Sequence, residues 1–250
     1  MSISAYTVDL ARVFISLAML GYASYRDFET REIHDIVWFI PAGCGLILDS
    51  YEYINGNLTG TGFIINVGFM VLLSGILWFL NLFGEADLIA FIALAIIHPR
   101  VPEFSFIGFP PLLFSFTLIS NSAISGLLMA LYTWARNIYT GKRGVSLFDR
   151  HEEVSPFKKI AIMFTGRKMP IKAVRGPPFE YPLEGRGKLI LQPNLFDDKK
   201  ARKVFRELRE RNVEWVWVSA TLPYIVVLLV GYLLSIVLGD LMFTFMSYLY

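Results

Sequence analysis

The dominant pattern along this chain is a series of long apolar stretches separated by short polar joins. A helix needs about 20 apolar residues to cross the hydrocarbon core of a bilayer. By that measure the sequence predicts six membrane spans, at residues 5–25, 36–54, 62–83, 87–99, 109–135 and 215–239. The fourth stretch, "DLIAFIALAIIHP", is short, and at about 1.5 Å per residue it covers only about two thirds of the core. We therefore expect it to lie deep within a helical bundle.

A polar segment, residues 136–214, separates the last two predicted spans. Within it, "FKKIAIMF" and "KLILQP" are rich in β-branched and aromatic residues, which predicts strands. After Asp197, apolar residues recur at helical spacing, and Asp197 or Asp198 would cap that helix. The expected fold class is an α-helical polytopic membrane protein of about six transmembrane helices, with a small α+β cytosolic domain between the last two. Its three parts are a transmembrane bundle, a cytosolic domain, and a final helix with its tail, at residues 1–135, 136–214 and 215–250.

Composition and charge place this chain in the membrane. The 55% of hydrophobic residues and the mean hydropathy of +0.52 exceed what a soluble domain of 250 residues requires. Basic residues in short loops mark the cytoplasmic side. Arg26 and Arg31 follow the first span, whereas the loops predicted on the opposite side contain only Arg100. We therefore predict a multi-pass plasma-membrane protein with both termini outside and the joins at 25–35 and 84–87 in the cytoplasm.

The remaining composition bears on cofactors and partners. One cysteine, Cys44, cannot form an internal disulfide or a Cys-based zinc site, and the three histidines are widely scattered. The sequence therefore predicts no metal and no cofactor. Of the 23 basic residues, 19 lie in 136–214 against 10 acidic ones, an excess that suits anionic membrane lipid. No nucleic-acid-binding motif accompanies this charge, so we expect no nucleic-acid partner.

Two aspartates stand out because they fall at the same predicted depth. Asp27 follows the first span and Asp87 begins the fourth, both at the cytoplasmic boundary. Two adjacent carboxylates share one proton, so that one can act as general base on a water while the other donates to the attacked carbonyl. The structural alternative is that each caps or ends a helix. Glu85 competes with Asp87, but it lies nearer the loop and is expected to be solvated.

The residues around the two aspartates resemble a known family. "SYRDFETREIHD", residues 24–35, resembles the first aspartate motif of the type IV prepilin peptidases, which are GxGD-type membrane aspartic proteases. "GEAD", residues 84–87, looks like their Gly-x-Gly-Asp motif, with Ala86 in place of the second glycine. The residue pattern of the first motif is similar to that of the archaeal preflagellin peptidase branch. The resemblance covers about residues 5–135.

This resemblance implies a reaction and a substrate. It implies an aspartic endopeptidase with Asp27 and Asp87 as catalytic residues, and with Gly84 giving the backbone freedom to place Asp87. The implied substrate is a preflagellin or pilin-like precursor, with a short basic leader before a long apolar helix. The acidic residues after the first span could contact that leader, although a solvated loop is their structural alternative: Glu29, Glu32 and Asp35. The four-cysteine segment of the bacterial members is missing, which implies cleavage without methylation.

Two other classes of function fit a basic, apolar chain. A small ion-coupled transporter would place ionisable groups near the bilayer midplane and usually has an internal repeat. The sequence has no such repeat, and its candidate acids lie at one surface. A non-catalytic membrane scaffold could use the basic cytosolic domain to recruit partners, but it would leave the paired aspartate motifs without a role.

Overall fold

The computed structural model describes residues 4–80, 82–151, 153–185, 188–191, 193, 197–220 and 224–249. The chain divides into two compact units. The first, the helical unit, comprises Met1–Gly126 and Pro223–Tyr250, and the second, the mixed unit, comprises Leu127–Leu222. Helix α5 (Phe114–Lys142) begins in the helical unit and ends in the mixed unit.

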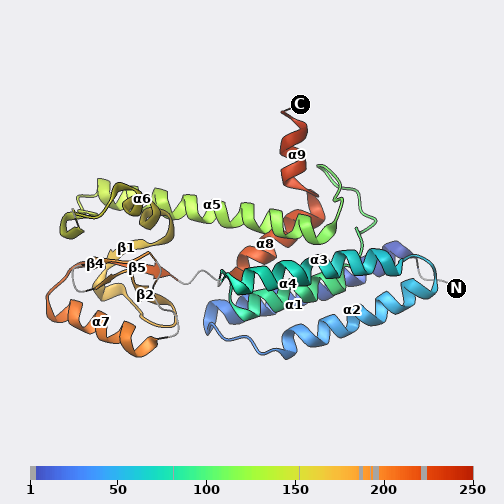
Figure 1. Ribbon diagram of the computed structural model, residues 1–250, viewed down its shortest axis with the longest axis horizontal. Helices are drawn as coiled ribbons and strands as arrows, with labels where there is room; N and C mark the ends of the chain where they lie inside the picture. Colours follow the sequence, from blue (N-terminus) through green and yellow to red (C-terminus); the bar gives the residue numbers. More distant parts are fainter. Residues whose placement is uncertain are drawn as a thin grey trace. The chain divides into compact units, whose positions relative to one another are not determined.

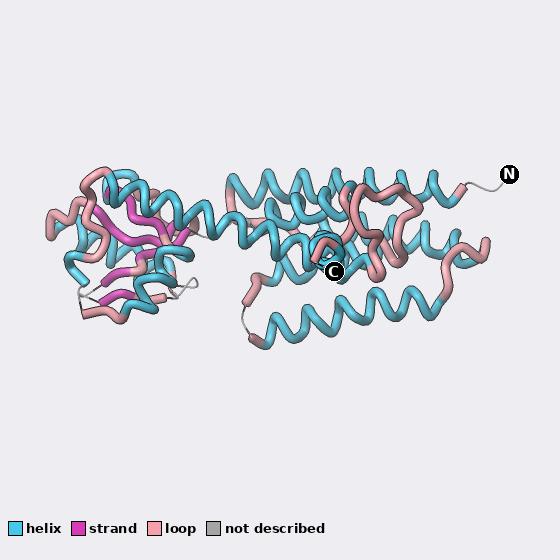
Figure 2. The backbone as a smooth tube through the Cα atoms, turned by 90° about the horizontal axis from the view of Figure 1, so that it is seen from above, coloured by secondary structure: helices cyan, strands magenta, loops and turns pink. Residues whose placement is uncertain are grey.

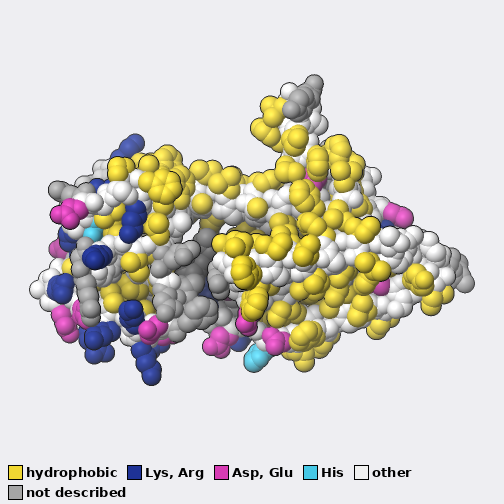
Figure 3. All heavy atoms as spheres, in the orientation of Figure 1, with side chains coloured by type: hydrophobic (Ala, Val, Ile, Leu, Met, Phe, Trp, Pro, Cys, Tyr) yellow, Lys and Arg dark blue, Asp and Glu magenta, His cyan; other side chains and the backbone are white. Residues whose placement is uncertain are grey.

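The helical unit is built around a short central helix. Helices α1 (Ala5–Glu29), α2 (Ile36–Ile54) and α3 (Gly60–Phe79) run alongside α4 (Glu85–Ile97), as Figures 1 and 2 show. After the mixed unit, α8 (Tyr224–Val237) packs against α1, and α9 (Leu241–Ser247) follows it. Large apolar side chains are exposed on the outer faces of these helices, which is the arrangement expected where lipid replaces water (Figure 3).

Helix α4 supplies much of the core of this unit. Ala90, Phe91, Leu94 and Ile97 are almost fully buried. The neighbouring helix α2 approaches closely at Gly45, where a Cβ atom would lie 3.0 Å from the Cα atom of Ile97. Small residues at such positions let helix backbones come together. The apolar part of α4 is therefore largely enclosed by its neighbours, as the sequence predicted for this short apolar stretch.

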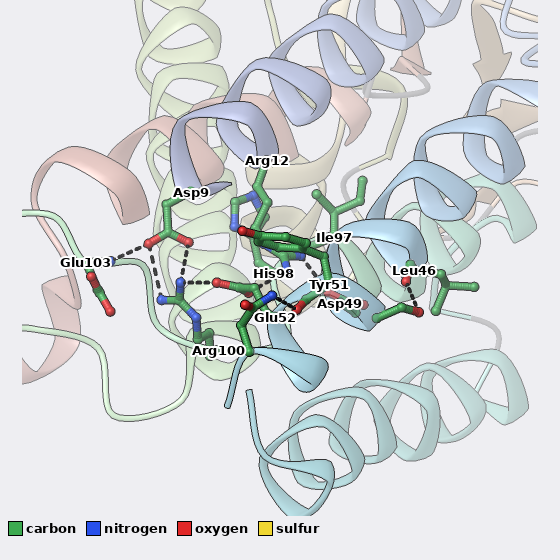
Figure 4. A network of polar contacts seen from close by, with 12 residues as sticks. Asp9, Arg12, Leu46, Asp49, Tyr51, Glu52, Ile97, His98, Arg100 and Glu103 are labelled. Atoms are coloured by element: carbon green, nitrogen blue, oxygen red, sulfur yellow. Dashed lines mark hydrogen bonds and ion pairs between the residues drawn. The ribbon is translucent and has the colours of Figure 1, made fainter. Parts of the chain in front are cut away.

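Beyond the C-terminal end of α4, buried ion pairs tie three segments together (Figure 4). Arg12 of α1 forms ion pairs with Asp49 Oδ1 at 2.6 Å and Glu52 Oε2 at 2.7 Å, both on α2. Arg12 also donates to the Ile97 carbonyl oxygen. Arg100 bonds Glu52 Oε1 at 2.6 Å and Asp9 Oδ1 at 3.1 Å. We call these five charged residues the ion network.

The prediction of six spans is confirmed only in part. Among the described residues, three helices are long and apolar enough to cross a membrane: α1, α3 and α5. Helix α2 has the predicted bounds, whereas α4 and α8 have only 13 and 14 residues. The stretch predicted as one span at 215–239 begins differently, because Trp215–Ala220 forms strand β5 and the helix starts at Tyr224.

The mixed unit contains a three-stranded antiparallel sheet in the order β1-β5-β2. Its strands are β1 (Arg167–Pro170), β2 (Glu180–Pro182) and β5, and the pair β3 (Glu184–Gly185) and β4 (Lys188–Leu189) forms a second sheet. Two short 3₁₀ helices, η1 (Asp149–His151) and η2 (Ile171–Ala173), complete the loops. The predicted domain boundary at 214 therefore misses β5, the central strand.

Each face of the sheet carries one helix. Helix α7 (Asp198–Glu210) packs Phe205 and Leu208 against Val216 and Val218, and Asp197 caps it by accepting from the Lys200 amide. Side chains alternate along a strand, so Trp217 points to the opposite face. There it meets Ile162 of α6 (Pro156–Thr165). The sequence correctly predicted α7, but its prediction of a strand at "FKKIAIMF" was wrong, because these residues form α6.

The ion network gives a prediction for stability. The Arg12 side chain is 1% exposed, and its removal leaves the buried Asp49 carboxylate without its cation. Breaking one partner of a buried ion pair costs about 3–5 kcal/mol. Arg12→Met should therefore lower the thermal unfolding midpoint of the detergent-solubilised protein markedly, as measured by circular dichroism.

Arg26→Met is the matched control, because Arg26 pairs with Glu29 at 3.5 Å on an exposed face. Exposed pairs contribute about 0–1 kcal/mol, so this variant should unfold close to the wild-type temperature. Equal losses in the two variants would show that the ion network does not hold the helices together.

Candidate active site

Asp27 lies in the last turn of α1 and is held by two contacts. Its Oδ1 atom forms an ion pair with Arg31 Nη1 at 3.3 Å. The Asp27 side chain also interacts with the backbone amide of Ile225, in the first turn of α8. The positive end of the α8 dipole therefore faces this carboxylate. With 14% of its side chain exposed, Asp27 is shielded but reachable.

Asp87 lies in the first turn of α4 and is partly buried. Its Oδ2 atom accepts a hydrogen bond of 3.3 Å from the Gly84 amide, which closes the N-terminus of the helix. Behind it, the ring of Tyr224 packs against Phe83 and Phe91, with ring centroids 4.6 and 5.9 Å away. An apolar aromatic wall thus adjoins a carboxylate at the start of a helix.

The two aspartates come from distant parts of the sequence but lie within electrostatic reach of one another. Arg31 acts on both carboxylates. Helices α1, α4 and α8 are in mutual contact, and the N-terminal ends of α4 and α8 both lie at this pair. We call Asp27 and Asp87 the carboxylate pair. This pair can bind a water and polarise a carbonyl, provided that one proton is present.

The other acidic residues singled out from the sequence are solvated. Glu85 is exposed at the start of α4, which distinguishes it from Asp87. Glu32 and Asp35 are exposed on the segment that joins α1 to α2. Glu29 is exposed at the last position of α1, where it pairs with Arg26. These three carboxylates surround the end of α1 without entering the carboxylate pair.

Gly84 supports Asp87 in a different way from the one the motif implies. Its φ of −71° and ψ of 158° are an extended conformation that any residue adopts, so no special backbone freedom is used here. A Cβ atom on residue 84 would meet Asp87 Oδ2 at 3.5 Å, an ordinary contact. Gly84 contributes its backbone N–H group, which donates a hydrogen bond to the side chain of Asp87.

Arg31 contacts the carboxylate pair, and the sequence analysis gave it no role at this site. It has a φ of 61°, in the left-handed region that side-chain-bearing residues seldom occupy. This conformation follows the end of α1, and the Arg31 side chain lies back against Asp27, four residues earlier. The i,i+4 spacing of an acid and a base could have indicated this pair.

Across the parts of the chain that the structure describes, His, Cys, Asp and Glu side chains form no group of three or more suited to hold a metal ion. The carboxylate pair has Arg31 as its neighbouring cation.

Comparisons with known proteins show what this chain is similar to. Residues 14–134, which include both aspartates, match the type IV leader peptidase family, and residues 158–241 match the archaeal Peptidase A24 C-terminus Type II. A preflagellin peptidase of Methanococcus voltae is 26% identical over 240 residues, which are 90% of this chain and 94% of that protein. One of Methanococcus maripaludis (strain C6) is 25% identical over 240 residues, 90% of this chain and 93% of its own length. No solved structure matches the chain.

The juxtaposition of α1 and α4 predicts a specific cross-link. Cys44 is the single native cysteine, so Cys44→Ser gives a background free of thiols. In it, Asp27→Cys combined with Asp87→Cys should be joined by a short thiol-specific bifunctional reagent in native membranes. The joined chain is detected by its faster migration in a denaturing gel.

The control pair is Asp27→Cys with Ser50→Cys. Ser50 is exposed beside Asp49, which binds Arg12 about four helical turns from Asp27. This pair should remain unlinked. If the 27–50 pair links as readily as the 27–87 pair, or if neither links, the two aspartates do not share one site.

Proposed function

From the membership of this chain in the type IV leader peptidase family, we propose that it is an aspartic endopeptidase that uses Asp27 and Asp87 to remove leader peptides. The relatives named preflagellin peptidase indicate preflagellin, the archaellin precursor, as the substrate, with type IV pilin-like precursors as close chemical equivalents. The observation that carries this proposal is the carboxylate pair, formed where the end of α1 meets the start of α4.

In the proposed reaction, the carboxylate pair holds one proton. The ionised member accepts a proton from a bound water as the water attacks the scissile carbonyl carbon. The protonated member donates a hydrogen bond to the carbonyl oxygen and stabilises the tetrahedral intermediate. That intermediate then collapses as the peptide nitrogen takes up a proton, the C–N bond breaks, and the leader leaves with a new carboxyl terminus.

Arg31 serves in this scheme as a positioning residue. Its guanidinium fixes the Asp27 side chain and carries a positive charge within reach of Asp87. The N-terminal ends of α4 and α8 favour negative charge at the same place, because helix N-termini carry a partial positive charge. Both features stabilise a net charge of −1 on the pair, which is the state the reaction requires.

The proposed substrate fits the surfaces on either side of the pair. Its apolar helix can lie in the bilayer against the exposed apolar faces of the helical unit. Its basic leader would then meet the exposed acids at the end of α1: Glu29, Glu32 and Asp35. The scissile bond, which joins the two parts, falls at the level of the carboxylate pair.

The membrane setting completes the proposal. Several apolar helices and the peptidase family make this a membrane protein. We place both termini outside and the carboxylate pair at the cytoplasmic face, with membrane lipid and the precursor as partners and no nucleic acid. A transporter would use buried ionisable groups along a pathway, but those of the ion network are paired with one another.

The central test replaces each aspartate separately. Asp27→Asn and Asp87→Asn keep the size and hydrogen-bonding capacity of the side chain but remove the acid. General acid–base catalysis contributes about 10²–10⁴-fold, so each variant should lose at least about 10²-fold in the rate of leader removal. The rate is measured by mass spectrometry with solubilised protein and a precursor archaellin.

Glu85→Gln is the matched control, because Glu85 is exposed beside Asp87 in the same helical turn. It should cleave at close to the wild-type rate. Retained activity in either Asn variant would reject the pair as the catalytic group, whereas an inactive Glu85→Gln would move the role from Asp87 to Glu85.

A second prediction separates the N–H group of Gly84 from its lack of a side chain. Gly84→Ala keeps the N–H group and adds a methyl group in ordinary contact, so leader removal should stay near the wild-type rate. Gly84→Pro has a compatible φ but no N–H group, and Asp87 loses its hydrogen bond. A hydrogen bond to a charged group contributes about 1.5–3 kcal/mol, so the rate should fall about tenfold or more. Equal rates in the two variants would contradict this role.

A further inference from the structure

Helix α6 of the mixed unit has one apolar face that contacts its own sheet and another that is exposed. Ile162 is fully buried against Leu183 and Trp217. Phe157 and Ile160 lie on the other face, and they are 79% and 55% exposed. One apolar face is enough for this ten-residue helix to pack against the sheet of its own unit, so the second apolar face is not required for that packing. The outer face therefore points to a second apolar environment.

Contacts within the mixed unit fix α6 beside the end of α5. The rings of Trp134 and Phe164 stack with centroids 5.8 Å apart. The Asn137 side chain donates to the carbonyl oxygens of Met163, at 2.9 Å, and Gly166, at 2.7 Å. Asn137 also accepts from the Lys168 amide at 3.1 Å. The C-terminal turn of α6 is thus held firmly at one level of α5.

That level of α5 has the composition of a membrane–water interface. Helix α5 is a candidate membrane span whose apolar part carries exposed Leu127, Leu128 and Leu131. The aromatic and basic residues come next along the helix, all of them exposed: Tyr132, Trp134, Arg136, Tyr139 and Lys142. Trp and Tyr gather at the headgroup level of spanning helices, and basic residues extend to the headgroups. Helix α6, fixed at Trp134 and Asn137, therefore lies at headgroup depth.

The basic side chains around the exposed face of α6 favour contact with a negatively charged surface. Lys158 and Lys159 stand between Phe157 and Ile160 in the sequence, and the Lys159 ammonium lies over the Phe148 ring at 5.7 Å. Arg143 follows the end of α5, and Asp149 and Glu153 are exposed acids before the helix. Figure 3 shows hydrophobic side chains gathered over α5 and α6, with Lys and Arg side chains close by.

We propose that α6 is an interfacial anchor, which inserts Phe157 and Ile160 into the leaflet that α5 enters and places Lys158 and Lys159 among anionic headgroups. The occupant of this apolar face is thus a lipid surface. Two features of α5 support a lipid surface over a protein partner. The apolar part of α5 ends close to the level at which α6 is held, and the aromatic and basic residues of α5 mark that level as the membrane–water interface. An amphipathic helix of this kind lies in the plane of the interface.

This anchor is independent of proteolysis, and it can be tested on the full-length protein. In the Cys44→Ser background, a spin label is attached at Phe157→Cys or Ile160→Cys, so that each variant keeps the other apolar side chain. Arg206→Cys, exposed on α7, provides the matched control. The proteins are reconstituted in nanodiscs of phosphatidylcholine, with or without phosphatidylglycerol. Access of the label to membrane-soluble oxygen and to a water-soluble nickel chelate is then measured by electron paramagnetic resonance.

The proposal predicts that labels at 157 and 160 favour oxygen over the nickel chelate several-fold more than the label at 206. Phosphatidylglycerol should increase this difference. Lys158→Gln with Lys159→Gln should remove that increase, whereas Lys199→Gln with Lys200→Gln on α7 should not. Free access of the nickel chelate to 157 and 160 would overturn the anchor. Protection from both reagents would mean that a second copy of the protein covers the face, which also rejects a lipid surface. If the accessibility of the labels to oxygen relative to the nickel chelate is the same with and without phosphatidylglycerol, the proposed role of Lys158 and Lys159 is wrong.

Discussion

The close packing of α4 among α1, α2 and α3 is the constraint on which the rest of the helical unit depends. This helix is too short to span a bilayer alone, and most of its apolar side chains are buried. Beyond its C-terminal end, Arg12 and Arg100 join α1, α2 and the following loop through buried carboxylates. Because that end is fixed, the N-terminal end of α4 has little freedom to move. Asp87, in the first turn of α4, is therefore held beside the end of α1.

The chemistry follows from this placement. Two carboxylates that repel each other are brought together by helix packing, and their mutual repulsion is moderated by three positive features: the Arg31 guanidinium and the N-termini of α4 and α8. The ion network pairs three carboxylates with two arginines and lies near the start of α1. The carboxylate pair lies near the end of α1, where Arg31 is the neighbouring cation of its two acids. The same helices thus hold the ion network at one end and the proposed catalytic pair at the other.

Sequence reasoning succeeded where spacing and motif agreed, and it failed where apolar content alone was used. Helices α1 to α4 begin and end within a few residues of the predicted spans, because long apolar runs end at clear polar joins. The apolar content of "FKKIAIMF" predicts a strand, but Ser155 and Pro156 before it are helix-start residues, and its apolar positions also fit a helix. Trp215–Ala220 was merged with the following span, because a buried strand and a membrane helix are both continuously apolar. The partners of Arg12 come from α2, so that tertiary packing, and not the nearby Asp9, decides its pairing.

Binding of a tetrahedral-intermediate mimic would show whether the two aspartates act together on one carbonyl group. A precursor peptide whose scissile carbonyl is replaced by a secondary alcohol would present its hydroxyl to both carboxylates at once. Analogues of this kind bind at least about 10²-fold more tightly than matched substrates, because the site is complementary to the transition state. We expect this gain for the wild-type protein in a calorimetric titration, and its loss in both Asp27→Asn and Asp87→Asn. Equal binding to the wild type and to either variant would contradict the claim that the two aspartates act together.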